Sequence, residues 1–326
     1  MLAFIAQRIG KAVIVLLAII VLNFFLIRMA PGDPALVMAG EAGAGDQIFV
    51  AQLRDKFGLD KPLPVQLYLY MKGIVSLDLG FSFRQQMPVA KLILDRLPAT
   101  LLLTGTAFAI SLAFGVLFGT LAARRAGSWM DTAITVLALI FYATPLFWVA
   151  LMAILLFSVT MDWLPSFGYE TVGANYIGLT HVLDVGAHLI MPATTIGLFF
   201  MATYARMTRA SMLEVKRLDF VKTARAKGLR DAVIQRRHVL RNALLPTITV
   251  LAQDFGFLIG GIVAVETIFA YPGLGRLLIH SLERQDLPLM QAAILMLTAV
   301  YCLANLAADL LYGVANPRIR YGGAVD

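Results

Sequence analysis

The most chemically distinctive stretch of the sequence is a basic segment, residues 206–246, which lies between two apolar runs. Its only acidic residues are Glu214, Asp219 and Asp231. The basic residues are Arg206, Arg209, Lys216, Arg217, Lys222, Arg225, Lys227, Arg230, Arg236, Arg237 and Arg241. Side chains of this kind suit binding to an acidic surface rather than covalent chemistry.

A short helix with recognisable ends is predicted inside this basic segment. Asp219 is placed to cap its N-terminus, because a carboxylate there accepts hydrogen bonds from the free N–H groups of the first turn. Residues 220–227 fill about two turns. Lys227 lies at the negative end of the helix dipole, and Gly228 follows where a left-handed residue is favoured. Since so short a helix is marginal alone in water, we expect another protein to hold it.

Sequence signatures of catalysis and of metal binding are absent. The chain has neither the Gly-x-x-x-x-Gly-Lys-Ser/Thr phosphate-binding loop nor a His-Glu-x-x-His pattern. Its histidines, His181, His188, His238 and His280, lie in connections without ligand spacing. The single cysteine, Cys302, excludes an internal disulfide and is expected to pack as a small apolar residue. We therefore predict no catalytic residue, no metal site and no cofactor in this chain.

The composition is that of a membrane protein. Of the 326 residues, 60% are hydrophobic and 14% are charged, and the mean hydropathy is +0.80. A soluble domain carries nearer a quarter charged residues. In a soluble protein the net charge of +7 would suggest nucleic-acid binding. Here the location of the charge matters more than its sum, and we expect no nucleic-acid partner.

Six apolar runs predict an all-α protein with six transmembrane helices, since a span needs ~20 largely apolar residues. The runs are Ala12–Ile27, Pro98–Ala123, Thr132–Met161, Leu189–Ala205, Thr247–Val265 and Leu287–Ala308. The first could be a signal peptide, but Met29–Pro34 is a poor cleavage site, so we interpret it as a retained span.

The distribution of Lys and Arg predicts the orientation of these spans. Basic residues cluster at the N-terminus, after the second run, in residues 206–246 and in the tail, whereas residues 158–188 have none. Short cytoplasmic loops carry the excess of Lys and Arg. Both termini and the basic segment are therefore expected in the cytoplasm.

Several residues inside the apolar runs have a predicted role in packing or transport. Asp254, which follows Gln253, either lines an aqueous pathway or forms a hydrogen bond between helices. The pairs Gly115–Gly119 and Gly256–Gly260 have the small-xxx-small spacing that lets helices approach closely in lipid. Pro145 is expected to kink the third span.

These features together resemble the permease subunits of dipeptide- and oligopeptide-type ABC importers. The residues that carry the resemblance are Thr223–Leu229 (Thr-Ala-Arg-Ala-Lys-Gly-Leu) and Arg241–Pro246 (Arg-Asn-Ala-Leu-Leu-Pro) in the basic segment. Met29–Ala35 is similar to the start of the first loop in B-type subunits. Glu266–Gly275 and Asn316–Tyr321 are similar to the turn after the fifth span and to the tail of the family.

The resemblance implies a type I importer fold with a coupling helix between spans four and five. Its coupling residues would be Asp219, Phe220, Val221, Lys222, Thr223, Ala224, Arg225, Lys227 and Gly228. Val221, Ala224 and Ala226 would enter a groove of a cytoplasmic ATPase, and Lys222 and Arg225 would meet acidic residues on its rim. Residues 1–96 would form the first span and an extracytoplasmic loop, residues 97–312 the transmembrane core, and residues 313–326 a cytoplasmic tail.

The same resemblance implies a bacterial or archaeal cytoplasmic (inner) membrane, and it implies the partners. A sister C-type permease would complete the pathway, two ATPase subunits would hydrolyse Mg-ATP, and an extracytoplasmic binding protein would deliver peptides. Importers of this branch also carry nickel, glutathione or sugars, so these substrates stay open. A secondary transporter driven by an ion gradient is the alternative class. It predicts internal repeats, broken helices and buried charges, and in the sequence only Asp254 fits this pattern.

Overall fold

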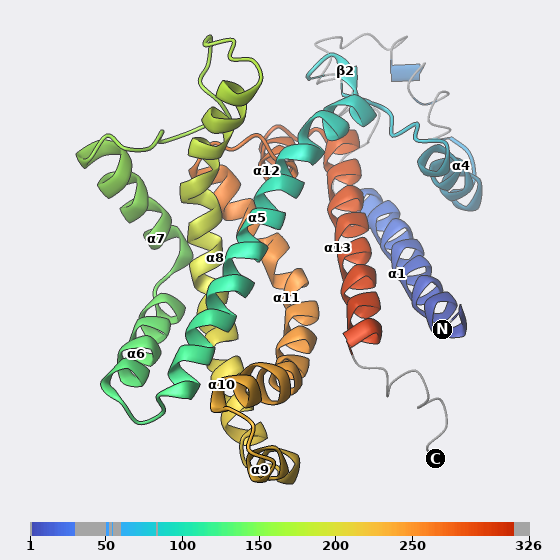
Figure 1. The fold of residues 1–326 in the computed structure, drawn as a ribbon. Helices are drawn as coiled ribbons and strands as arrows, with labels where there is room; N and C mark the ends of the chain where they lie inside the picture. Colours follow the sequence, from blue (N-terminus) through green and yellow to red (C-terminus); the bar gives the residue numbers. More distant parts are fainter. Residues whose placement is uncertain (1, 30–49, 52–53, 55–59, 83, 316–326) are drawn as a thin grey trace. The chain divides into compact units, whose positions relative to one another are not determined.

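The computed structural model describes residues 2–29, 50–51, 54, 60–82 and 84–315. The chain is helical apart from one short β-hairpin, and it forms two compact units (Figure 1). The larger unit comprises Leu101–Tyr271 and the chain from Ala304 onward, and the smaller unit comprises Leu2–Thr100 and Pro272–Leu303. Residues 30–35 and 316–321, which contribute to the family resemblance, lie outside the described residues.

The smaller unit is built around α1 (Leu2–Met29), which packs against α4 (Leu63–Val75). The Arg28 guanidinium donates to Gln66 Oε1 at 2.6 Å and lies 3.5 Å from the centroid of the Phe24 ring. The Asn23 amide donates to the carbonyl oxygen of Gln291 at 3.1 Å, in α13 (Leu287–Ala315). Asn23, within the apolar run of α1, and Arg28, just after it, therefore form hydrogen bonds to neighbouring helices.

A buried carboxylate joins the β-hairpin of the smaller unit to the start of α13. Strand β1 (Phe81–Ser82) pairs antiparallel with β2 (Met87–Pro88). Ser82 Oγ donates to Asp286 Oδ2 at 2.5 Å, and Asp286 Oδ1 accepts from the Leu289 N–H at 3.3 Å. Because both carboxylate oxygens are satisfied, Asp286 can be buried at low cost. The short helix α12 (Leu274–Glu283) completes this unit.

The larger unit is organised around α8 (Leu179–Val215), which packs against α6, α7 and α11. These helices are α6 (Trp129–Ala143), α7 (Leu146–Ala153) and α11 (Arg241–Ile268). Three short helices follow α8 in the sequence and precede α11. They are α9 (Asp219–Ala226), α10 (Asp231–Val233) and the π-helix η2 (Ile234–Leu240). The basic segment thus forms its own cap of short helices at one end of α8 (Figure 1).

Glycines bring α8 against α5 (Val89–Arg124). A Cβ at Gly119 would lie 2.6 Å from the Ala205 carbonyl oxygen, and one at Gly115 would lie 2.6 Å from Tyr204 Cβ. Both distances are shorter than real contacts, so only glycine fits at these positions. The expectation of close helix approach is confirmed for Gly115–Gly119, whereas the surroundings of Gly256–Gly260 lie outside the described side chains.

The third apolar run is broken rather than kinked. The pair α6 and α7, with the π-helix η1 (Ile154–Thr160) continuing α7, is bent by 102°. Pro145 is the N-cap of α7, and Thr144 before it is extended with ψ 132°. The proline ring disfavours the helical conformation for the residue before it, and proline has no N–H with which to continue the hydrogen bonds of the preceding helix. The predicted disturbance of the third span at Pro145 is therefore confirmed, but it is a complete break between two helices rather than a kink within one.

Within the described residues, four helices are long and apolar enough to cross a membrane. They are α1, α5, α8 and α13, and the bent pair makes a fifth if it forms one span. The remaining predicted run, Thr247–Val265, lies within the 28-residue helix α11. The predicted helical fold with several apolar spans is therefore confirmed, whereas the count of six spans stays a prediction.

Candidate functional site

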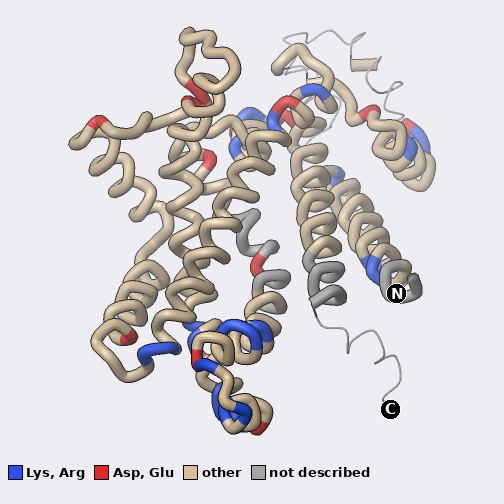
Figure 2. The backbone as a smooth tube through the Cα atoms, in the orientation of Figure 1, with Lys and Arg blue, Asp and Glu red and all other residues tan. Residues whose placement is uncertain are grey.

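The basic segment folds into a compact structure between the end of α8 and the start of α11. Figure 2 shows Lys and Arg concentrated along α9, α10 and η2. The amphipathic sequence of α9 explains why it forms here, because its apolar residues recur at helical spacing among charged ones. This segment is therefore the strongest candidate for a site that binds a partner.

The start of α9 differs from the prediction. Leu218 is the N-cap, with extended backbone (ψ 150°), and no side chain caps the helix. Asp219 is instead the first helical residue, and its carboxylate accepts from Lys222 Nζ at 2.8 Å. Asp219 still stabilises the helix because a negative charge in the first turn complements the dipole. The prediction that it caps the helix through its side chain was wrong.

The end of α9 is the glycine turn that the sequence predicts. Gly228 has φ +76°, in the left-handed region, and follows the C-cap Lys227. The Leu229 N–H donates to the Ala224 carbonyl oxygen at 3.3 Å, and the Gly228 N–H donates to the Arg225 carbonyl oxygen at 2.9 Å. This pair of hydrogen bonds is the Schellman motif, which satisfies the free carbonyl groups of the last turn.

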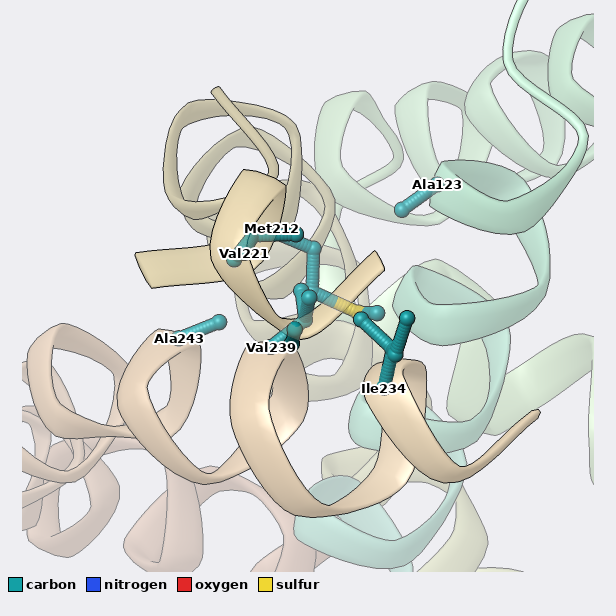
Figure 3. Close-up of a cluster of buried hydrophobic side chains, with 7 residues drawn as sticks. Ala123, Met212, Val221, Ile234, Val239 and Ala243 are labelled. Atoms are coloured by element: carbon teal, nitrogen blue, oxygen red, sulfur yellow. The ribbon is translucent and has the colours of Figure 1, made fainter. Parts of the chain in front are cut away.

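A buried apolar cluster holds α9 in place, so the chain itself does what was expected of another protein. Val221 is fully buried and Ala224 is 5% exposed. Val221 points toward side chains from α5, α8, η2 and α11 (Figure 3), and Ala224 belongs to the same buried cluster. The buried members of the cluster are Ala123, Met212, Val221, Ala224, Ile234, Val239 and Ala243. The prediction that Val221 and Ala224 enter a partner's groove was therefore wrong.

The opposite face of α9 is free to meet a partner. Asp219, Lys222, Thr223 and Ala226 are all exposed, and their spacing places them away from Val221 and Ala224. We call these four residues the outer face of α9. Large apolar side chains are exposed beside it: Leu218 (46%), Phe220 (41%) and Leu229 (40%). Exposed apolar residues among charged ones are typical of protein-binding surfaces.

Two of the predicted partner-binding cations form ion pairs within the segment. Lys222 pairs with Asp219 at 2.8 Å, and Arg225 Nε lies 3.6 Å from Asp231 Oδ1. All four side chains are largely exposed, and such pairs contribute little stability. Lys222 and Arg225 can therefore leave Asp219 and Asp231 and pair with acidic residues of a partner at a small cost in free energy. Lys227 has no ion pair among the described residues.

Buried polar contacts tie the base of the segment to α5 and α6. Lys216 Nζ donates to the carbonyl oxygen of Ala123, and burial together with nearby Arg124 and Arg225 lowers the pKa of Lys216. Arg209 Nε donates to Asp131 Oδ1 at 2.5 Å, and Arg209 Nη2 donates to Asp131 Oδ2 at 2.7 Å. Charge-assisted bidentate pairs of this kind are strong and directional. A movement imposed on the segment would therefore be passed to α5, α6 and α8.

Sequence reasoning missed these anchoring residues. Asp131 and Arg209 are 78 positions apart, and no sequence motif links them. The only local signal was Ser128, whose hydroxyl accepts from the Asp131 N–H at 3.4 Å and caps α6. The position of Asp131 at the edge of an apolar run suggests that it has a buried partner. The sequence does not show that this partner is Arg209.

The candidate pathway acid Asp254 lies on α11 beside Tyr204 of α8. Within the described residues, neither the Tyr204 hydroxyl nor Asp254 Oδ2 completes a hydrogen bond. Nearby along the same two helices, the hydroxyls of Thr208 and Thr247 are 3.3 Å apart. The two helices thus share a polar seam in an otherwise apolar core. The side chain of Gln253 lies outside the described residues.

Comparison with known proteins defines the class to which this architecture belongs. Residues 115–321 match the family described as binding-protein-dependent transport system inner membrane component, and residues 1–104 match the N-terminal model of that family. The chain therefore belongs to this family of membrane permeases, as its sequence motifs predicted.

Individual relatives match along nearly the whole chain. The dipeptide transport system permease protein DppB of Escherichia coli (strain K12) is 40% identical over 338 residues, covering 98% of this chain and 99% of that protein. A peptide transport system permease protein of Brucella abortus (strain 2308) is 40% identical over 321 residues, covering 98% of this chain and 100% of that protein.

A solved structure has the same fold. It is an inward-facing conformation of the MetNI methionine ABC transporter, with a TM-score of 0.57 at 17% identity. The match covers 70% of this chain and 98% of that chain. The chain thus shares its fold with a chain of that transporter.

Proposed function

We propose that this chain is one permease subunit of an ABC importer that carries di- or oligopeptides across the cytoplasmic membrane. The peptide assignment is supported by relatives 40% identical over almost their whole length, which are named as dipeptide and peptide permeases. A sister permease completes the pathway, two ATPase subunits supply energy from Mg-ATP, and an extracytoplasmic binding protein delivers the substrate.

The observation that carries this proposal is the outer face of α9. The helix has eight residues, and its buried side chains pack against α5, α8, η2 and α11. Its outer face exposes compact and charged residues. The outer face of α9 binds in a groove on an ATPase subunit. When the two ATPases close, they move α8 and α5 as rigid bodies. Residues 206–246 are therefore the coupling segment, with α9 as the coupling helix between spans four and five.

The remaining organisation follows from the same proposal. Six spans cross the membrane with both termini in the cytoplasm, and the coupling segment lies on the cytoplasmic side. Residues 1–96 supply the first span and an extracytoplasmic loop, residues 97–312 form the transmembrane core, and residues 313–326 form the tail. Asp254, with Gln253 before it, belongs to the wall of the pathway.

Substitution on the outer face of α9 tests the coupling role. Ala226 is exposed, so Ala226→Trp adds bulk to the partner-facing surface without entering the buried cluster. We expect the variant to insert and pair with the sister permease but to lose the ATPases on co-purification, or to hydrolyse ATP without uptake. Ala224→Trp cannot serve here, because Ala224 is buried and the variant would disturb folding.

Two matched controls accompany this experiment. Ala226→Ser keeps a small side chain at the same position and should transport normally. Ala126→Trp adds the same bulk at an exposed turn before α6, outside α9. Normal transport by Ala226→Trp with the ATPases bound would contradict the coupling role. Uptake by the chain alone under an ion gradient would contradict the importer assignment, and a ligand panel on the cognate binding protein tests the substrate.

A further inference from the structure

A basic cavity in the smaller unit is not used by the proposed coupling mechanism. Its volume is about 200 Å³, and it lies between the first turns of α5, the hairpin and α12. The lining residues are Gln85, Arg96, Pro272, Gly273, Arg276, Leu277, His280 and Arg284. Among the described residues no Asp or Glu lines it. A concave site with several cationic donors and no acid is suited to an anion.

The charges of this cavity are not cancelled by the acids nearby. Asp286 is buried and its carboxylate is occupied by Ser82 and by the Leu289 N–H. Glu283 is exposed and faces His280 at 3.4 Å, which leaves Arg284 without an ion pair among the described residues. Arg276 already interacts within the chain, so Arg96 and Arg284 are the side chains best placed to bind an added anion.

The position of the two arginines in the sequence indicates the depth of the cavity in the membrane. Arg96 lies just before the apolar run that begins at Pro98, and Arg284 lies just before α13, which begins at Leu287. Residues at the edge of a span lie at the level of the lipid headgroups. The cavity is also smaller than the ~300–1,000 Å³ of sites that enclose a whole small molecule. It can hold one headgroup while the acyl chains remain in the bilayer.

We propose that this cavity binds the phosphate of an anionic phospholipid headgroup, phosphatidylglycerol. Arg96 of α5 and Arg284, which follows α12, donate to the phosphate oxygens. The neutral amide of Gln85 provides a partner for the glycerol hydroxyls. Phosphatidylethanolamine is bound less well, because its ammonium group would find no carboxylate in the cavity. The bound lipid would connect the start of α5 to α12. This proposal does not depend on which side of the membrane the coupling segment faces.

Native mass spectrometry of the full chain in detergent tests the proposal. We expect one phosphatidylglycerol to be retained in preference to phosphatidylethanolamine. Arg96→Gln/Arg284→Gln should weaken its retention about tenfold or more, since a charge-assisted hydrogen bond contributes a factor of at least that order. Lys72→Gln/Lys91→Gln removes the same charge from exposed positions outside the cavity and should change nothing.

Further arms distinguish the source of the anion. Arg284→Gln alone is safe for folding because this side chain is exposed, and it should already reduce retention. Equal retention of phosphatidylglycerol by the double variant and the parent chain would overturn the proposal. Binding of inorganic phosphate without binding of the lipid would also overturn it. So would a double variant that keeps the lipid but no longer binds the extracytoplasmic binding protein, because the anion would then be an acidic side chain of that partner.

Discussion

Single residues set the direction in which the coupling segment leaves α9. Gly228 adopts φ +76° with open space around the position where a Cβ would lie. Steric crowding by neighbours is therefore not what requires glycine here. The requirement is conformational, because a side chain in the left-handed region costs ~1–2 kcal/mol for most residues and more for β-branched ones.

This distinction predicts different effects for two substitutions of Gly228. Gly228→Val should redirect the exit from α9 and reduce coupled transport, because valine is strained at positive φ. Gly228→Asn should keep most activity, because asparagine tolerates that region. Uptake and ATPase activity of the reconstituted importer measure both. Equal activity of the valine and asparagine variants would show that the turn does not need a left-handed residue.

Asp254 is the second residue whose role a substitution can decide. Its carboxylate lies beside Tyr204 without a completed hydrogen bond on Oδ2. If the acid lines the pathway, Asp254→Leu should assemble normally yet change the transport rate, and Asp254→Asn should change it as well. Assembly is measured by co-purification of the sister permease. Loss of folding in Asp254→Leu together with full activity in Asp254→Asn would identify a purely structural hydrogen bond.

At the level of elements, α5 and α8 form a tightly joined pair. Gly115 and Gly119 leave room for the backbone of α8, so the two helices approach more closely than side chains would permit. Lys216 adds a hydrogen bond from the end of α8 to Ala123 at the end of α5. The pair can therefore respond as one body to a force applied at α9.

The same substitution at two glycines of α5 tests this packing. Gly119→Ala places a Cβ 2.6 Å from the Ala205 carbonyl oxygen, and we expect it to destabilise the protein by ~1–3 kcal/mol. Gly105→Ala meets nothing within 4 Å and should be neutral or stabilising, since alanine favours helix over glycine. Thermal unfolding in detergent compares the two. A fall in melting temperature of the same size for both would rule out close helix packing as the cause.

For the whole molecule, the proposed orientation rests on the distribution of Lys and Arg. Cysteine labelling in intact cells tests it, starting from Cys302→Ala to remove the native thiol. Cysteines at Ala126 and Arg225 should resist a membrane-impermeant reagent added outside, whereas one at Val172, which is 98% exposed, should react. These positions are preferable to the adjacent Gly127 and Gly173, whose φ values of +80° and +83° would strain a cysteine. Labelling at Ala126 or Arg225 from outside would reverse the assignment.

Much of this protein can be predicted from the sequence because the relevant signals are local. Apolar runs of about the length that crosses a membrane core indicate transmembrane helices, whatever they pack against. The helix of residues 219–226 and its glycine turn follow from amphipathic spacing and from a residue that permits positive φ. The motifs of the basic segment identified the family for the same reason, since each lies within a short stretch of chain.

The orientation of α9 was decided only by the tertiary structure. The sequence shows Val221 and Ala224 on one helical face but does not say whether that face meets a partner or the chain itself. Met212 of α8 covers this face together with Ile234 and Val239 of η2. Likewise, Pro145 predicts a disturbed helix, but the 102° bend depends on how α6 and α7 each pack against α8. The hydrophobic effect favours burying an apolar face but does not specify which residues cover it. Contacts between residues distant in the sequence therefore determine which surface stays exposed for a partner.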